Sequence, residues 1–219
     1  MNQLPIRTDP FAQERATMVQ QQLRERGIRD QRVLDAMLRV PRHEFVLPEY
    51  RSQAYEDHPI PIGMEQTVSQ PFIIAVSLQA LGLQGTESVL EVGTGSGYQT
   101  ALLAMLARGV YSIERHESLA HSAATILALL GFSNVKVVVG DGSQGLREHA
   151  PFDAIVVSAA SPSVPRSLFD QLSDYGRMVI PVGPPQAQEL QLVRKQKDHL
   201  LVEVLEGCRF VPLIGAEGY

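Results

Sequence analysis

Three glycines within five residues mark the stretch of this chain best suited to hold a ligand. They are Gly93, Gly95 and Gly97. The apolar run Ser88–Val92 precedes them, and a segment of helical pattern, Tyr98–Ala107, follows. Glycine lets a backbone turn tightly and lets a ligand approach without a Cβ in the way. A helix that begins after such a turn presents unpaired N–H groups and its positive dipole end. The pattern therefore predicts a cradle for a nucleotide-like ligand at the end of a parallel strand.

Acidic residues in three successive predicted strands are the second chemical signal. Glu91 lies in the strand before the glycines, Glu114 ends the next strand, and Asp141 ends the third. The carboxyl ends of parallel strands meet at one edge of a sheet, where open α/β folds bind ligands. Glu114 comes about 20 residues after Gly93, where a carboxylate can accept hydrogen bonds from both hydroxyls of a ribose. Each acid alone would be interpreted as a solvated loop carboxylate, but together the three indicate a site.

The spacing of the glycines separates two classes of cofactor. A dinucleotide fingerprint requires G-x-G-x-x-G, and here Tyr98 occupies the position of the third glycine. G-x-G-x-G after a strand that carries Glu91 instead resembles the S-adenosylmethionine motif of class I methyltransferases. That resemblance implies that Asp141 contacts the amino group of adenine. S-adenosyl-L-methionine is therefore the expected cofactor, and a dinucleotide oxidoreductase is the weaker alternative.

Alternating strand and helix patterns position these residues. The predicted strands are Ser88–Val92, Val110–Ile113, Val135–Val139, Ala154–Ser158 and Arg177–Val182, and the predicted helices are Tyr98–Ala107, Ser118–Leu130 and one that opens at Pro165. Such alternation predicts βαβ units and a parallel sheet with helices on both faces. Three strand-like runs without intervening helices follow and should pair antiparallel. These runs are Glu189–Lys195, Leu200–Leu205 and Cys208–Leu213.

Two helices and a proline-rich stretch precede the first strand pattern. Phe11–Arg26 has helical spacing, and Gly27 is a natural stop. A second helix follows, with Asp30 as its N-cap, and it ends before Pro41. The stretch Pro41–Gly63 contains four prolines and is expected to be irregular.

The chain contains no internal repeat and no linker, so we predict a single domain over residues 1–219. The fold class is α/β, a Rossmann-like doubly wound sheet of about seven strands, mostly parallel, with an antiparallel C-terminal part. Residues 1–63 form N-terminal helices and an irregular loop, residues 64–183 the cofactor-binding core, and residues 184–219 the antiparallel C-terminal strands.

Composition limits the partners and the compartment. The net charge of −5 argues against a nucleic-acid partner, which usually requires a basic footprint. Cys208 is the only cysteine, which excludes an intrachain disulfide, argues against a cysteine-based metal site and fits a reducing compartment. The sequence shows no apolar core of signal-peptide type and no apolar run long enough to span a membrane. We expect a cytoplasmic monomer with no membrane partner and no bound metal.

The segment Gln66-Thr67-Val68-Ser69-Gln70 precedes a third predicted helix, which begins at Pro71 and runs to Leu81. From residue types alone, Thr67, Ser69 or Gln70 would serve to cap this helix. The loop after the fourth strand reads Ser158-Ala159-Ala160-Ser161-Pro162. It lacks the Asn/Asp-Pro-Pro-aromatic motif that methylation of amino-adenine or amide groups commonly uses.

From about Val33 to Leu213 the chain resembles the protein-L-isoaspartate O-methyltransferase family, whose members methyl-esterify isoaspartyl residues in damaged proteins. The Thr-Val-Ser-Gln-Pro segment and the ending Arg-Phe-Val-Pro-Leu are specific to that family, whereas many methyltransferases share the glycine motif. The matching segments are Val40–Val46, Tyr55–Asp57, Pro61–Gly63, Gln66–Pro71, Leu90–Tyr98, Gly140–Gly142, Ala150–Ile155, Ile180–Gly183 and Arg209–Leu213.

The resemblance implies an active-site role for Ser69 rather than a capping role. In the family this serine is assigned to the active site, and its loop lies beside the methyl group of the cofactor. A carboxylate acceptor is already ionised at neutral pH and needs no general base. Ser69 would therefore orient the acceptor as a hydrogen-bond donor. The cofactor-binding residues implied are Gln66, Thr67, Val68, Glu91, Gly93, Thr94, Gly95, Ser96, Gly97, Glu114, Arg115, Asp141, Gly142 and Ser158.

Four residues depart from the family pattern. Glu65 and Tyr175 stand where glycine is usual, Ser143 stands where tryptophan is usual, and Ser161 stands where proline is common. They leave open an altered peptide preference or a reduced activity. Two alternatives follow: a methyltransferase of the same family that acts on another carboxylate, and a non-catalytic module that binds S-adenosylmethionine. The presence of Ser69 favours an enzyme acting on isoaspartyl proteins and peptides.

Overall fold

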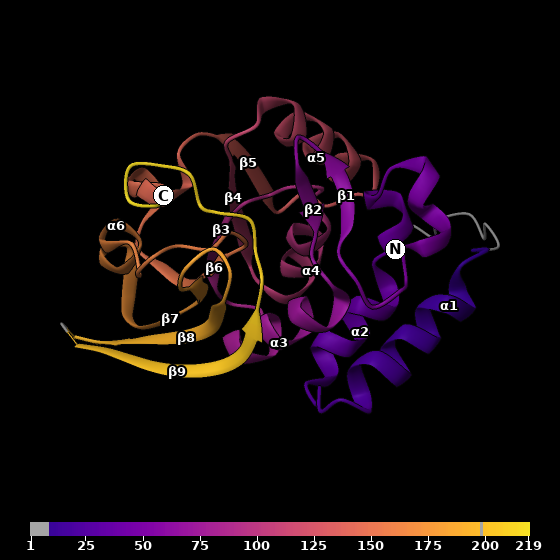
Figure 1. Ribbon diagram of the computed structural model, residues 1–219, viewed down its shortest axis with the longest axis horizontal. Coiled ribbons are helices and arrows are strands. Elements are labelled where there is room, and N and C mark those ends of the chain that lie inside the picture. The colour runs from indigo at the N-terminus through magenta and orange to yellow at the C-terminus, as the bar shows by residue number, and fades with distance from the viewer. Residues whose placement is uncertain (1–8, 198) are drawn as a thin grey trace.

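The computed structural model describes residues 9–197 and 199–219. Its centre is one mixed sheet (Figure 1). The strands of this sheet are β3 (Ser88–Val92), β4 (Gly109–Glu114), β5 (Val135–Val139), β6 (Phe152–Val157), β7 (Leu172–Val182), β8 (Gln188–Gln196) and β9 (His199–Cys208). Their order is β5-β4-β3-β6-β7-β8-β9, in which the pairs from β5 to β7 are parallel and the last two pairs are antiparallel. The predicted fold class is confirmed.

The winding of the sheet changes direction at β3. The chain first adds β4 and β5 on one side of β3 and then crosses to β6 and β7 on the other side. The carboxyl ends of β3 and β6 thus border the point where the strand order reverses. Open α/β sheets bind their ligands at such a point.

The two faces of the sheet carry separate apolar cores. The longer helices are α3 (Pro71–Leu81), α4 (Tyr98–Leu106) and α5 (Glu117–Leu129), and the shorter segments are η4 (Gly142–Gln144), η5 (Arg147–His149) and α6 (Arg166–Asp170). Alternate strand residues such as Val89 and Val156 belong to the larger core, which the N-terminal helices and α3 to α5 complete. Their neighbours Leu90 and Val157 belong to the second core, together with Leu168 of α6.

The first predicted helix is wound differently from expectation. It begins as α1 (Ala12–Thr17) and continues as the π-helix η1 (Met18–Arg24), so most of the predicted range Phe11–Arg26 is helical, but its second half has the wider i→i+5 winding. Three residues of η1 are buried in the main core, and packing of this kind outweighs intrinsic helix preference. The next helix, α2 (Gln31–Arg39), confirms its predicted cap, because Asp30 Oδ1 accepts from the backbone N–H of Arg32 at 2.9 Å.

The stretch Pro41–Gly63 is more regular than predicted. It contains two 3₁₀ helices, η2 (Arg42–Phe45) and η3 (Pro48–Gln53), and the strand β1 (Ile60–Gly63). β1 pairs antiparallel with β2 (Gln66–Val68) in a separate hairpin. Proline is compatible with the first turn of a short helix and with edge strands, so proline content alone was a poor guide to irregularity.

The helix α3 begins at Pro71, as predicted, but no side chain caps it. Its N-cap residue is Gln70, and no side-chain hydrogen bond reaches its first turn. The capping interpretation of Thr67, Ser69 and Gln70 is therefore wrong. Gln70 Nε2 instead donates to the carbonyl of Asp57 at 3.1 Å, and Thr67 and Ser69 are left available for other contacts.

The C-terminal segment departs from the predicted pattern of three strands. β8 and β9 pair antiparallel as expected, but Cys208–Leu213 does not form a third strand. Beyond β9 this segment runs beside the loop after β6, where Pro212 forms a parallel bridge with Ala160. Proline has no backbone donor to continue a ladder. The five strands predicted up to Val182 and the two tail strands β8 and β9 make up the seven strands of the sheet.

None of the helices formed by residues 9–197 and 199–219 is long and apolar enough to cross a lipid bilayer.

Candidate active site

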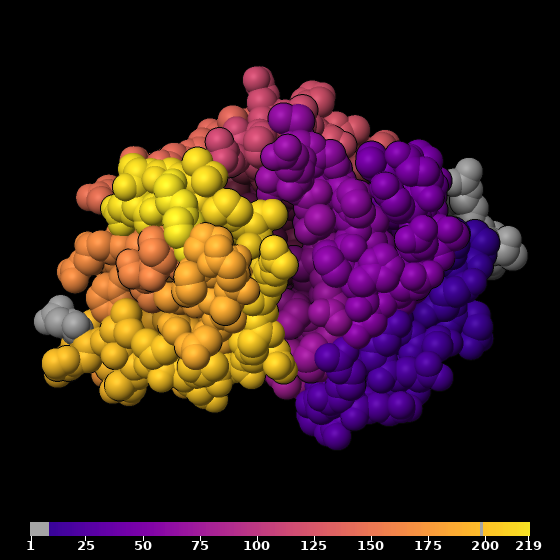
Figure 2. All heavy atoms as spheres, viewed as in Figure 1, coloured from indigo at the N-terminus to yellow at the C-terminus, as the bar shows by residue number. Residues whose placement is uncertain are grey.

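Two cavities lie side by side where the hairpin, the sheet and the C-terminal segment meet. The first has a volume of about 460 Å³ and lies over the carboxyl ends of β3 and β4. The second has a volume of about 500 Å³ and lies between the start of α3 and residues 207–211. Both are lined by Thr67, Ser69, Ser158 and Val211. In Figure 2 the purple segment that carries Ser69 borders the yellow C-terminal segment, and the cavities lie along this border.

The glycine turn forms the floor of the first cavity, and two of its positions require glycine. Gly93 has φ of 92°, and a Cβ there would lie 3.3 Å from the Cβ of Ser158. Gly97 has φ of 89° and is the N-cap of α4, where a Cβ would lie 3.2 Å from that of Ala123. Larger residues at these positions would be strained in the backbone and crowded by neighbours. The turn is therefore packed closely against Ser158, which follows β6, and against Ala123 of α5.

Glu114 presents a fixed carboxylate to the first cavity. Its Oε2 accepts from the backbone N–H of Gly95 at 2.9 Å, and its Oε1 accepts from that of His116 at 3.0 Å. These bonds hold the carboxylate at the end of β4, where Arg115 and His116 also line the cavity. A carboxylate can accept about four hydrogen bonds, so both oxygens retain capacity for a ligand. This arrangement suits a pair of neighbouring hydroxyl groups.

Glu91 lies beneath the turn and not in either cavity. It is fully buried, and its Oε2 accepts from the hydroxyls of Thr100 at 2.5 Å and Ser112 at 2.6 Å. Gln99 donates to its Oε1 at 3.2 Å. Burial raises the pKa of Glu91 to about 7, although these donors act in the opposite direction. In this structure Glu91 supports the turn from below.

Asp141 holds the C-terminal tail. Its Oδ1 accepts from the backbone N–H and the hydroxyl of Ser143, at 2.9 and 2.7 Å, and its Oδ2 accepts from Ala216 N–H at 2.8 Å. Burial acts to raise the pKa of Asp141, but the donors Ala216 and Ser143 bring it below its ordinary value. Asp141 does not line the first cavity, whereas its neighbour Gly142 and the tail residue Leu213 do. Its contact with adenine stays a prediction.

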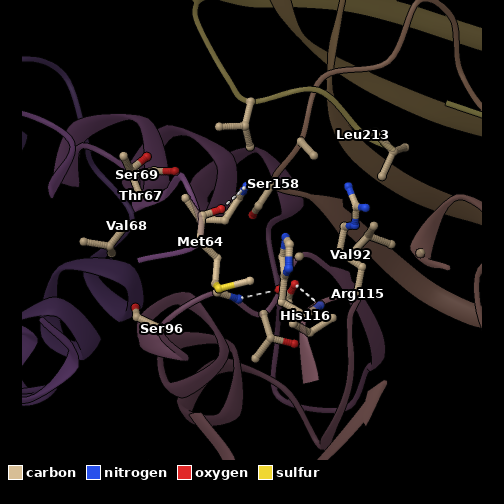
Figure 3. Close-up of a pocket in the computed structure, with 18 of the residues that line it drawn as sticks. Met64, Thr67, Val68, Ser69, Val92, Ser96, Arg115, His116, Ser158 and Leu213 are labelled. Atoms are coloured by element: carbon tan, nitrogen blue, oxygen red, sulfur yellow. Dashed lines mark hydrogen bonds between the residues drawn. The ribbon is translucent and has the colours of Figure 1, made fainter. Parts of the chain in front are cut away.

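The hairpin of β1 and β2 brings Ser69 to the junction of the two cavities. Its turn residues Met64 and Glu65 have φ of 52° and 58°, which is unusual for residues other than glycine. The hydroxyl of Ser69 makes no hydrogen bond within the described part of the chain, and its carbonyl accepts from Arg42 Nη2 at 2.8 Å. Figure 3 shows Ser69 and Thr67 at one end of the first cavity and Arg115 toward the other.

Most of the residues predicted to form the site share the first cavity, although their contacts with a cofactor stay predictions. Those that line it are Gln66, Thr67, Val68, Ser69, Gly93, Thr94, Gly95, Ser96, Glu114, Arg115, Gly142 and Ser158. The exceptions are Glu91, Gly97 and Asp141, which support the cavity from behind its surface. The three acids lie in the predicted region, but a sequence does not show whether an acid faces a cavity, as Glu114 does, or is turned away from it, as Glu91 and Asp141 are.

Several lining residues were not predicted. They are Met64, Ile74, Val92, Gln99, Ile113, His116, Ala159, Val211, Pro212, Leu213 and Ile214, and Glu65, which departs from the family pattern, lines the cavity as well. The clearest available signal was the Arg-Phe-Val-Pro-Leu segment, because it matched the family yet had no assigned role. The structure shows that it closes one side of both cavities.

A family model described as "Protein-L-isoaspartate(D-aspartate) O-methyltransferase (PCMT)" matches residues 13–218. The chain belongs to this family. Relatives named protein-L-isoaspartate O-methyltransferase include one from Koribacter versatilis, 55% identical over 95% of this chain and 94% of the relative. Another, from Syntrophus aciditrophicus, is 51% identical over 96% of this chain and 98% of the relative.

Solved structures of the family share the fold. One named protein-L-isoaspartate O-methyltransferase has a TM-score of 0.84 and 30% identity, and the match covers 93% of this chain and 67% of that one. A second is described as a putative family member from Plasmodium falciparum in complex with S-adenosyl-L-homocysteine. It has a TM-score of 0.79 and 26% identity, over 91% of this chain and 98% of that one. The family fold therefore extends over nearly the whole of this chain.

Proposed function

We propose that this chain methylates the free carboxylate of L-isoaspartyl residues in damaged proteins and peptides, with S-adenosyl-L-methionine as the methyl donor. The ester would then cyclise to a succinimide and so begin repair. The observation that carries the proposal is the meeting of two cavities at Ser69, because methyl transfer needs a donor and an acceptor site that share a boundary. Membership of the family, and the names of its members, support the choice of substrate.

The first cavity fits the methyl donor. A carboxylate with spare acceptor capacity, Glu114, lies at the end of β4 and would hold the ribose hydroxyls. The glycine turn and Gly142 allow close approach of the backbone, since a Cβ on Gly142 would lie 2.5 Å from Val92 Cγ1. When bound, the cofactor supplies an electrophilic methyl group on a sulfonium. Thr67 and Ser69 would border that end of the donor site, because they line both cavities.

The second cavity fits an anionic peptide group. Arg209 lines it, is exposed, and makes no ion pair with the other residues that the structure describes. In a protein with a net charge of −5, a cation at this place offsets repulsion of a carboxylate that enters the site. Phe210 and Ile73 add apolar surface for the rest of the peptide.

The residues at the junction need only orient the acceptor. Its carboxylate is ionised at neutral pH, so no residue has to remove a proton. The free hydroxyl of Ser69 can donate a hydrogen bond to one carboxylate oxygen and direct the other toward the methyl group. Orientation of this kind supplies several kcal/mol toward crossing the barrier. Enclosure between the hairpin and the C-terminal segment would also remove water that solvates the nucleophile.

We also propose that the whole chain acts as one domain. The division between residues 1–63 and 64–183 passes through the β1–β2 hairpin, in which Ile60 pairs with Val68. Arg42 of the N-terminal part is bonded to Ser69 of the next part. These contacts support an N-terminal segment that cannot be removed without loss of the site.

The test is transfer of a labelled methyl group from S-adenosylmethionine to two peptides that differ only in aspartate or isoaspartate at one position. We expect the labelled methyl group to appear as a base-labile ester on the isoaspartyl peptide and to be absent from the aspartyl peptide. Equal labelling of both would point to a different carboxylate acceptor. Binding of the cofactor without labelling of either would point to a non-catalytic module, and both results would contradict the proposal.

A further inference from the structure

Arg42 is the most deeply buried cation among the described residues. It begins η2, within the segment Val40–Val46, and its side chain has no exposed surface. No carboxylate of the described residues lies within ion-pair distance of it. A buried, unpaired guanidinium is costly, so a role that needs its charge or its shape is expected.

The guanidinium joins two backbone segments that are far apart in the sequence. Its Nε donates to the carbonyl of Ala54 at 2.8 Å, and its Nη2 donates to the carbonyl of Ser69 at 2.8 Å. Hydrogen bonds from a charged donor are about twice as strong as neutral ones. The planar fork of arginine makes both at fixed angles, which the single ammonium of lysine cannot reproduce.

The same guanidinium lies over the ring of Tyr98, with 4.8 Å between its central carbon and the ring centroid. Tyr98 is fully buried and is the first residue of α4, directly after Gly97. The ring of Phe45, also in η2, packs edge-on against Tyr98 at 5.7 Å. One side chain therefore contacts both the backbone of Ser69 and the start of the helix that follows the glycine turn.

We propose that Arg42 is a positioning residue that sets the place of Ser69 relative to the cofactor turn. This inference rests on the proposed function, because it concerns methyl transfer at Ser69. Arg42 touches neither cavity, so it acts through the Ser69 carbonyl and the Tyr98 ring. Loss of the fork would let the Ser69 backbone shift while leaving Glu114 and the glycine turn in place. The expected effect is therefore on turnover and not on cofactor affinity.

Arg42→Lys keeps the charge and removes the fork. We expect kcat on an isoaspartyl peptide to fall about 10- to 100-fold, because small misplacements of a reacting group cost rates of this order. The Kd of S-adenosyl-L-homocysteine should stay within about twofold of wild type, as expected for a loss confined to the transition state. The matched control is Arg177→Lys. Arg177 also donates to backbone carbonyls, those of Leu81 and Gly82, but at the opposite end of α3. This control should lower thermal stability and leave kcat near wild type.

A double-mutant cycle with Ser69→Ala separates positioning from general destabilisation. If Arg42 acts through Ser69, Arg42→Lys should add little to the loss already caused by Ser69→Ala. A double variant whose kcat falls by the product of the two single fold-losses would overturn the inference. An Arg42→Lys variant whose cofactor affinity falls as much as its kcat would overturn it too. Should Arg42→Lys fail to fold, Tyr98→Leu must show the same lack of additivity with Ser69→Ala, since it removes the ring against which the fork lies.

The wild-type rate in the same assay distinguishes two failures. A wild-type protein that labels the isoaspartyl peptide while the losses multiply would contradict only the role of Arg42. A wild-type protein that labels neither peptide would contradict the proposed function and the role of Arg42 with it.

Discussion

Glu65 places a carboxylate at the rim of the first cavity, where the family pattern has glycine. Its φ of 58° lies in the left-handed region, so the position is one that glycine would occupy without strain. The side chain lies four positions before Ser69 in the chain, at the end of the hairpin that leads to the junction. An anion at this place opposes a second anion that enters the junction.

Glu65→Gln should lower the KM for an isoaspartyl peptide by about two- to fivefold at low ionic strength. The reason is removal of like-charge repulsion, which salt screens, so the difference should shrink as ionic strength rises. The measurement is KM at two salt concentrations. Glu49→Gln, an exposed acid outside both cavities, is the matched control. A KM that is unchanged at low salt would show that Glu65 does not face the acceptor.

At the level of elements, the C-terminal tail is fastened across the first cavity by a chain of polar contacts. Asp141 and Ser143 accept from the backbone of Ala216 and Glu217. The carboxylate of Glu217 accepts in turn from the backbone and hydroxyl of Ser167, beside the start of α6. Ser143, which stands where the family usually has tryptophan, thus supplies a hydroxyl that the tail uses. The departure at Ser143 is accounted for by its contact with the tail.

Glu217→Ala should lower the free energy of unfolding by about 1 kcal/mol, because two acceptors are lost and the Ser167 N–H is left unpaired. Affinity for S-adenosyl-L-homocysteine should weaken as well, since Leu213 and Ile214 of the same tail line the first cavity. Denaturant unfolding and titration calorimetry measure the two effects. Glu206→Ala, an exposed acid in β9, serves as the control. If the Glu217 variant has the wild-type free energy of unfolding and the wild-type affinity for S-adenosyl-L-homocysteine, the tail keeps its place without the contact to Ser167.

The elements show which parts of the structure the sequence could predict. The strands from Ser88 to Val157 were found close to their bounds, because strand and helix patterns alternate there with clear stops. The β1–β2 hairpin was missed, since Met64 and Glu65 form its turn with positive φ and give none of the usual turn signals. The role of Asp141 in holding the tail was invisible, because its partner Ala216 lies at the far end of the sequence.

At the scale of the whole molecule, the buried acid Glu91 makes stability depend on pH. Burial raises its folded-state pKa to about 7, above the ordinary value of 4.5. The folded state therefore binds more protons than the unfolded state between these values. The contribution of Glu91 to stability is fully present below pH 4.5 and is lost as pH rises through 7. The loss amounts to at most about 3 kcal/mol.

Glu91→Gln should flatten this dependence. Between pH 5 and pH 8 the wild-type protein should lose more stability than the variant, because glutamine carries no proton to release. Other groups that titrate in this range are common to both proteins and cancel in the difference. Denaturant unfolding of both proteins at the two pH values measures it. Equal changes in the two proteins would show that Glu91 ionises in the folded state as readily as in water.

The proposed function requires that methyl transfer to an isoaspartyl carboxylate takes place at the junction of the two cavities, beside Ser69. The most direct measurement is the single-turnover rate of labelled methyl transfer to an isoaspartyl peptide, by wild type and by Ser69→Ala, at saturating cofactor. We expect a rate about 10- to 100-fold lower in the variant, with the Kd of S-adenosyl-L-homocysteine nearly unchanged. Transfer by Ser69→Ala at the wild-type rate would show that Ser69 does not orient the acceptor.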